Sequence, residues 1–131
     1  MITKAESEKP INRVGKLQNY NIMALRKVKS FTLMNQGGFV CDIHCIYFDN
    51  DGNQRGDVPN HDNFPLGQSR TMDIKAKIPS LEDGSIVKMK AWVMWGSDNT
   101  FPSMFMYDPN GEDLSFSISG TTLDNRLGLN M

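Results

Sequence analysis

The residues best suited to nucleophilic or metal chemistry lie close together in the stretch FVCDIHCIYF. Cys41, His44 and Cys45 stand within five residues of one another, beside Asp42. A catalytic thiol needs an open, electropositive surrounding, and a zinc site needs further Cys or His ligands at suitable spacing. The alternation of apolar and polar residues instead predicts a strand whose cysteines face the core as small hydrophobic side chains. We therefore expect no catalytic residues here and no enzyme activity.

The stretch DNDGN begins like a calcium-binding loop. Asp49, Asp51 and Asn53 alternate as in an EF-hand, but the glycine stands at the fourth loop position. The twelfth position is Asn60, where an EF-hand has a bidentate glutamate. A strand–turn–strand explains the stretch better. His61 also lacks zinc-ligand spacing to another Cys or His, so no metal or other cofactor is expected.

A candidate site of another kind lies near the end of the sequence, in FSISGTTLDNRLGL. A strand-like alternation stops at Gly120, and the uncharged Thr121, Thr122 and Leu123 follow, although turns favour Asn, Asp, Gly or Pro. In one interpretation a threonine hydroxyl and an exposed leucine contact a ligand. In the other, the threonines end a strand and Leu123 closes the bottom of the fold.

Period-two alternation predicts the elements that position these residues. The expected strands cover residues 30–35, 39–48, 70–78, 85–95, 103–107 and 113–119. Gln36-Gly37-Gly38 carries a hairpin signal between the first two strands. No amphipathic helix separates the strands, which predicts an all-β fold: an antiparallel β-sandwich of immunoglobulin-like or C2-like type. We expect six to eight strands, with fewer than about 15% of the residues in helices.

The same alternation predicts the core and the binding end. The core residues are expected to be Phe39, Ile43, Met89, Phe116 and Ile118. The long loops at 50–68 and 96–102, together with the end at 120–129, are the places where binding is expected.

Charge divides the chain into two parts. Residues 1–29 hold seven basic and two acidic side chains, whereas residues 30–131 hold seven basic and thirteen acidic ones. We interpret 1–29 as a basic, irregular or partly helical segment and 30–131 as the β-sandwich domain. The segment either binds an anionic partner or lies against its own domain. The net charge of −1 argues against a nucleic-acid partner.

Cysteine spacing and the N-terminal sequence bear on the compartment. Cys41 and Cys45 on one strand would place their Cα atoms roughly 13 Å apart, too far for a disulfide. The start, MITKAESEKP, is polar and lacks an apolar signal core. No apolar run reaches the roughly 18 to 20 residues that span a bilayer. We expect free thiols and a protein that is cytoplasmic as synthesised; later release and peripheral membrane association stay open.

An ordered set of motifs resembles the C-terminal membrane-recognition domain of the cholesterol-dependent (thiol-activated) cytolysins. The motifs are NQGGFVCDIHCIYFDNDGN, the Ile78-Pro79 pair, VKMKAW and SISGTTL, the last being similar to the family's closing SIWGTTL. They extend over about 95 residues, from Gln36 to roughly Asn130. The resemblance implies a β-sandwich, in agreement with the periodicity.

The resemblance also implies which residues bind. In the family, a Thr-Leu pair on a membrane-facing loop recognises sterol, and its counterparts here are Thr122 and Leu123. The family's tryptophan-rich loop would fall near WVMWGSDNTFP, where Gly96 fits but the cysteine, the later tryptophans and the arginine are missing. Trp95 and Phe101 are the aromatic residues left there. The pore-forming domains have no counterpart, so we expect no pore from this chain by itself.

Together these observations predict a non-enzymatic recognition module. Loops at one end of the sandwich would bind a membrane lipid, sterol included, or a surface glycan in a lectin-like manner, and the resemblance makes the module toxin-related. The alternative is a structural protein that self-assembles through edge strands and exposed methionines into a homo-oligomer or larger assembly.

Overall fold

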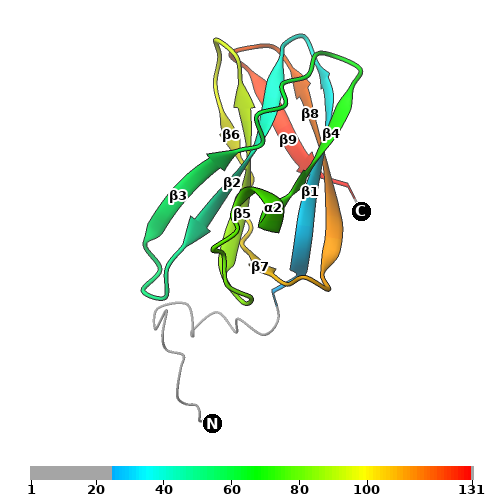
Figure 1. Cartoon of the computed structure of the whole chain (residues 1–131). Coiled ribbons are helices and arrows are strands. Elements are labelled where there is room, and N and C mark those ends of the chain that lie inside the picture. Colours follow the sequence, from blue (N-terminus) through cyan, green and yellow to red (C-terminus); the bar gives the residue numbers. More distant parts are fainter. Residues whose placement is uncertain (1–24, 131) are drawn as a thin grey trace.

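Two layers of β-strand face each other in the computed structural model, which describes residues 25–130 (Figure 1). The basic segment predicted over 1–29 lies outside the described residues up to position 24. Its end does not coincide with a structural boundary, because the first strand already begins at Lys27.

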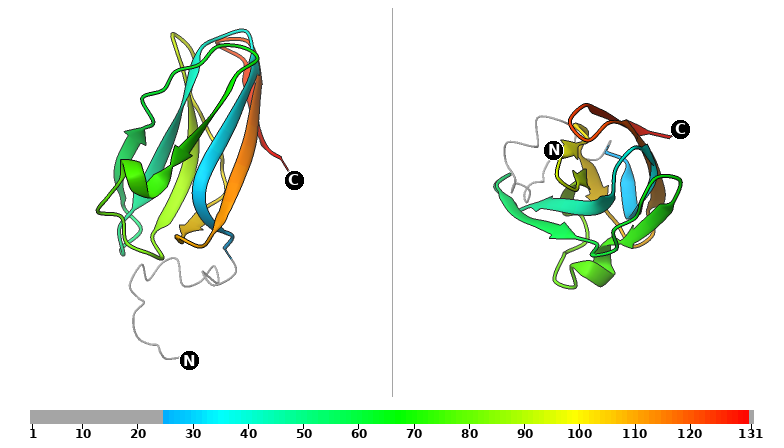
Figure 2. Two further views of the ribbon diagram at one scale, coloured as in Figure 1. Left: turned by 45° about the vertical axis from the view of Figure 1, so that its right-hand side comes forward. Right: turned by 90° about the horizontal axis from the view of Figure 1, so that it is seen from above.

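Each layer contains four strands that run along the long axis of the molecule (Figure 2). The first layer consists of β3 (Gln54–Pro59), β2 (Cys41–Phe48), β5 (Ile86–Val93) and the short β6 (Asn99–Thr100). The second layer consists of β4 (Ser69–Asp73), β1 (Lys27–Gly37), β8 (Glu112–Gly120) and β9 (Asn125–Leu129). The strand β7 (Phe105–Tyr107) pairs with both β5 and β1, so the two layers are one continuous open sheet.

The all-β sandwich predicted from the sequence is therefore confirmed. Helix is confined, within the described residues, to the four-residue α2 (Ile74–Lys77). Most strand pairs are antiparallel as expected, but β1 runs parallel to β7 and to β8. The described residues form nine strands rather than six to eight, because β3, β6 and β9 lie in segments that the sequence predicted to be loops.

The predicted hairpin at Gln36-Gly37-Gly38 is wrong. β1 and β2 are not paired; the chain crosses there from one layer to the other. Buried Asn35 fixes the crossing, since its Nδ2 donates to the carbonyl of Phe39 at 2.7 Å and its Oδ1 accepts from Gly37 N. A Cβ on Gly37 would lie 2.3 Å from the ring of Phe39. The glycine thus serves close packing rather than a hairpin turn.

The strand predicted over 70–78 ends early, at Asp73. The Asp73 carboxylate accepts a hydrogen bond from Ala76 N and caps the single turn of α2. Ala76 is consequently exposed. The helical turn moves the chain away from β1 beyond the Ser30–Asp73 pair.

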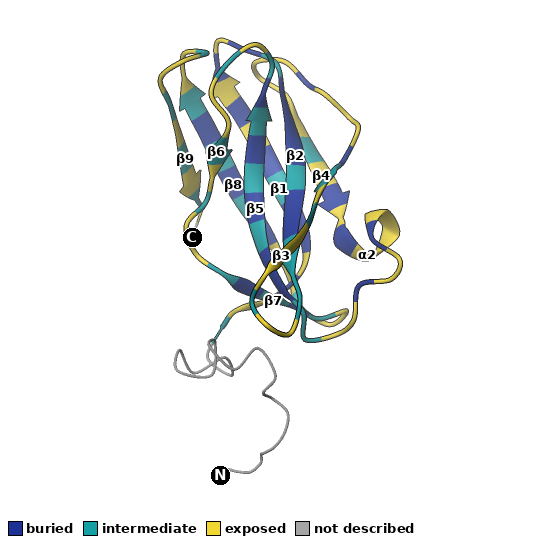
Figure 3. Cartoon of the chain, turned by 90° about the vertical axis from the view of Figure 1, so that its left-hand side faces the viewer, coloured by how far each residue is buried: buried dark blue, intermediate teal, exposed yellow. Residues whose placement is uncertain are grey.

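All five predicted core residues are buried. Buried and half-buried residues alternate along β5 and β8, as Figure 3 shows. At the centre, the Phe116 ring meets those of Phe31 and Phe105 at centroid distances of 5.8 and 6.2 Å. Both cysteines are buried free thiols, as predicted. Within residues 25–130, no helix has the length and apolar character needed to cross a membrane.

Candidate functional site

Three loops meet at one end of the sandwich, and we call them together the tip: residues 65–68, 94–98 and 121–124. The strand registers place them there, because Met34 pairs with Ser69, Gly37 with Gly120, and Cys41 with Val93. In Figure 1 these loops lie at the top, opposite β7.

The loop 121–124 is the turn of the β8–β9 hairpin. Gly120 pairs with Asn125 and has a positive φ of 105°, a conformation that suits glycine. Thr121 and Asp124 close the turn through hydrogen bonds between their backbones and through the Thr121 hydroxyl. Leu123 gains no packing from this arrangement and is 75% exposed. Of the two interpretations of GTTL, the one in which Leu123 closes the bottom of the fold is wrong, because the side chain is exposed.

Trp95 stands in the turn after β5, whereas the strand predicted over 85–95 included it. β5 ends at Val93, whose N–H donates to the Asp98 carboxylate and whose carbonyl accepts from Gly96 N. Trp95 is left with φ of 57° and 91% of its surface exposed. A bulky residue in the left-handed region is strained, and such strain concentrates at functional sites.

The turns that carry Trp95 and Leu123 are docked against each other. Ser97 N donates to the carbonyl of Thr122 at 3.0 Å, and the Asn125 amide donates to the carbonyl of Ser97 at 2.8 Å. A Cβ on Gly96 would lie 2.2 Å from the Thr122 oxygen, so only glycine allows this contact. The structure therefore brings together the turns that carry Trp95, Thr122 and Leu123. Thr122 is half-buried, and the other two side chains are exposed.

Leu66 is a tip residue that sequence reasoning missed. It is 61% exposed in the loop before β4, and Asn35 holds that loop through backbone hydrogen bonds with Gly67 and Gln68. The buried ring of Phe64 anchors the preceding segment. An apolar residue in the centre of the turn sequence FPLGQS is the signal that could have revealed it.

Phe101, the fourth predicted binding residue, is separated from the tip. Its ring packs against the core, with centroid distances of 5.1 Å to Phe116 and 6.2 Å to Phe105.

Apart from the tip, a cluster of polar side chains lies on the outer face of β3, β2 and β5. Asp57 accepts hydrogen bonds from His44 Nδ1 at 2.6 Å and from Lys90 Nζ at 2.5 Å, and the His44 ring stacks on Trp92. Burial raises the pKa of Asp57, but the bonds from Lys90 and His44 outweigh it and leave that pKa below its ordinary value. The cluster joins three neighbouring strands.

The cysteines are unsuited to nucleophilic chemistry. Burial, and secondarily the charge of Asp42, raises the pKa of Cys41 to about 12; burial and the charge of Asp57 also raise the pKa of Cys45. Asp49 is occupied as a turn residue that accepts from the N–H groups of Asp51 and Asn53 and pairs with Arg55. Residues 25–130 contain no group of three or more His, Cys, Asp or Glu side chains placed to hold a metal ion.

Comparison with known proteins finds similarity among solved structures. No protein-family model and no curated protein matches the sequence. Among solved structures, the membrane-binding domain of pneumolysin is 16% identical, with a TM-score of 0.40 over 78% of this chain and 95% of that domain. Listeriolysin O is 14% identical over 78% of this chain, with a TM-score of 0.42, and suilysin from Streptococcus suis is 18% identical over 79%, with a TM-score of 0.40.

These neighbours are cytolysins, the family whose motifs the sequence resembles. The chain spans only 22% of the listeriolysin O chain and 23% of the suilysin chain.

Proposed function

We propose that this chain is a non-enzymatic, toxin-related recognition module whose tip binds the surface of a lipid membrane. One observation carries the proposal. Of the four large hydrophobic side chains that are exposed among the described residues, Leu66, Trp95 and Leu123 all belong to the tip. The fourth, Met34, lies on the flank of β1.

The physical reason is the cost of leaving these side chains in water. Burying a leucine in an apolar medium gains about 1.5 to 3 kcal/mol. An indole ring suits the boundary between lipid headgroups and acyl chains, because it has a large apolar body and one N–H donor. The docked turns hold Trp95 and Leu123 in place before binding, which lowers the entropy lost on binding.

A more specific form of the proposal is that the tip recognises sterol. It rests on the motif resemblance, in which the counterparts of Thr122 and Leu123 recognise sterol. A half-buried threonine, Thr122, beside an exposed leucine suits a ligand with one hydroxyl group and an apolar body. Phe101, which packs inward, has no part in this proposal.

Flotation with two kinds of vesicle tests the proposal: phosphatidylcholine alone, and phosphatidylcholine with cholesterol. We expect the chain to float with vesicles, and Trp95→Ala and Leu123→Ala each to weaken this association about tenfold or more. Binding to both kinds of vesicle would support a lipid-binding tip without sterol specificity. A requirement for cholesterol would support the more specific form.

Met34→Ala is the matched control, since it removes an exposed hydrophobic side chain outside the tip. It should leave vesicle association unchanged. Leu123→Ala should change the free energy of unfolding by no more than about 0.5 kcal/mol, as at other surface positions. If neither kind of vesicle binds the chain, or if the two tip variants bind like the parent, the proposal is wrong.

A further inference from the structure

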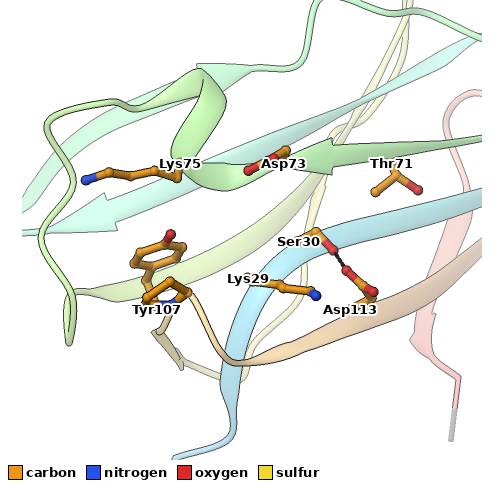
Figure 4. Close-up of a pocket in the computed structure, with 8 residues that line it drawn as sticks. Lys29, Ser30, Thr71, Asp73, Lys75, Tyr107 and Asp113 are labelled. Carbon is orange, nitrogen blue, oxygen red and sulfur yellow. Dashed lines mark hydrogen bonds between the residues drawn. The ribbon is translucent and has the colours of Figure 1, made fainter.

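A pocket of about 410 Å³ opens between β1, the end of β4 and α2 (Figure 4). β4 follows β1 only as far as the Ser30–Asp73 pair, after which α2 turns away. The register between β1 and β8 shifts at the same point, between Val28 and Ser30. Such irregularities commonly lie beside binding sites. The pocket is some seven residues along β1 from Gly37, about 23 Å from the tip, so it is a separate site.

Tyr107 provides the strongest sign of a ligand. The residue is only 3% exposed, and its hydroxyl points into the pocket (Figure 4). That hydroxyl has no hydrogen-bond partner among residues 25–130. A buried hydroxyl without a partner is costly. Burial and then the charges of Asp83, Asp73 and Asp108 raise the pKa of Tyr107, so the phenol stays protonated and can donate.

The other residues that line the pocket provide both hydrogen-bond donors and hydrogen-bond acceptors. Ser30 donates to the Asp113 carboxylate, and the hydroxyl of Thr71 bonds that of Thr32 at 2.7 Å, so each group is already oriented. The Asp73 carboxylate keeps one oxygen beyond the one that caps α2. Hydroxyl groups and carboxylates side by side match a ligand that presents several hydroxyl groups.

The charges of the pocket cancel. Lys29 and Lys75 stand against Asp73 and Asp113. The Lys75 ammonium donates to the carbonyl of Leu81 at 2.5 Å, which occupies part of its capacity to bind an anion. A strongly charged ligand such as phosphate therefore gains little here, and a neutral ligand fits better. The volume lies within the range of roughly 300 to 1,000 Å³ found for small-molecule sites.

We propose that this pocket binds a neutral, polyhydroxylated ring, one hexose unit of a glycan, with the Tyr107 hydroxyl as a central donor. The site does not depend on membrane binding by the tip, so the two proposals can fail separately.

Saturation-transfer NMR and calorimetry test the pocket. The probes are the methyl glycosides of glucose, galactose, mannose and N-acetylglucosamine, at concentrations to about 50 mM, since so small a ligand is expected to bind in the millimolar range. At least one glycoside should bind. Tyr107→Phe and Asp113→Asn should each weaken that binding about tenfold or more. Phosphocholine, a charged probe, should not compete.

The controls separate a binding role from a structural one. Tyr47→Phe removes a tyrosine hydroxyl elsewhere, and Leu123→Ala alters the tip; both should bind the glycoside like the parent. Because its hydroxyl has no partner, Tyr107→Phe should not lower the melting temperature. If it does, Thr71→Val provides a second variant that keeps the side-chain volume. Binding of none of the four glycosides, displacement by phosphocholine, or undiminished binding by the pocket variants would overturn the proposal.

Discussion

Phe116 illustrates how much a single residue of this chain can determine. It is fully buried, and its ring contacts three other phenylalanine rings, those of Phe31, Phe101 and Phe105, from both layers. Its place was evident from the sequence, because Leu114, Phe116 and Ile118 alternate with serines along one strand. Trp95 was not evident in the same way: the alternation continues through Val93 to Trp95, and the strand ends before it because Val93 bonds Asp98 and Gly96 in the turn.

Replacing Phe116 with alanine should lower the free energy of unfolding by roughly 3 to 5 kcal/mol, because the change removes a large apolar side chain and leaves a cavity. Chemical denaturation followed by circular dichroism measures this. Met34→Ala, a truncation at an exposed position of β1, is the control and should lower the free energy of unfolding far less. A loss below about 1 kcal/mol for Phe116→Ala would contradict the packing described here.

At the scale of elements, the contact between the β5–β6 and β8–β9 turns requires a glycine at position 96. A Cβ at position 96 would overlap the Thr122 carbonyl oxygen. Gly96→Ala should therefore separate the turns and lower the free energy of unfolding by about 1 to 3 kcal/mol. It should also weaken vesicle association. Gly128 on β9 has open space around its Cα, so Gly128→Ala should change neither property. Thermal unfolding and flotation of the two variants side by side would refute this contact if they behave alike.

The Asp57 cluster joins β3 to β2 and β5, and its effect should depend on pH. Asp57 has a lower pKa in the folded protein than in the unfolded chain. The contribution of the Asp57 charge to the free energy of unfolding is therefore fully present above the unfolded pKa of about 3.9. This contribution is lost as the pH falls through the folded pKa. Asp57→Asn should destabilise the protein at pH 7, and the difference from the parent should shrink below about pH 4.

Denaturant unfolding at a series of pH values measures this difference. Asp51→Asn, at an exposed turn position, should be nearly neutral throughout. A destabilisation by Asp57→Asn that is the same at pH 3 and pH 7 would show that the carboxylate charge is not the cause.

Local patterns predicted strands well and connections poorly. β5 and β8 follow from alternation between inward and outward residues, and the first half of β2 does too. The strand β3 did not, because QRGDVP lacks alternation and owes its form to pairing with β2. The crossing after Gly37 looked like a hairpin because a Gly-Gly pair carries no information about which strand pairs with which. For the same reason, the Tyr107 pocket depends on where α2 leaves β1 and could not be anticipated from residue types.

At the scale of the whole molecule, the tip and the Tyr107 pocket are two independent surfaces on one frame. The frame is continuous because β7 pairs with both layers at the end opposite the tip. At the tip itself, the layers are joined by hydrogen bonds between turns, such as those from Ser97 to Thr122 and from Asn125 to Ser97.

The parallel pairing of β1 with β8 has a mechanical consequence. β1 enters the frame at the end opposite the tip, and β8 leads into the turn that carries Leu123. A force that pulls the start of β1 away from an anchored Leu123 acts along both strands. It therefore loads the hydrogen bonds from Val28 to Gly37 in shear, all at once, instead of unzipping them one after another. Anchored at its tip, the module would resist extension along its long axis more strongly than a hairpin opened from one end.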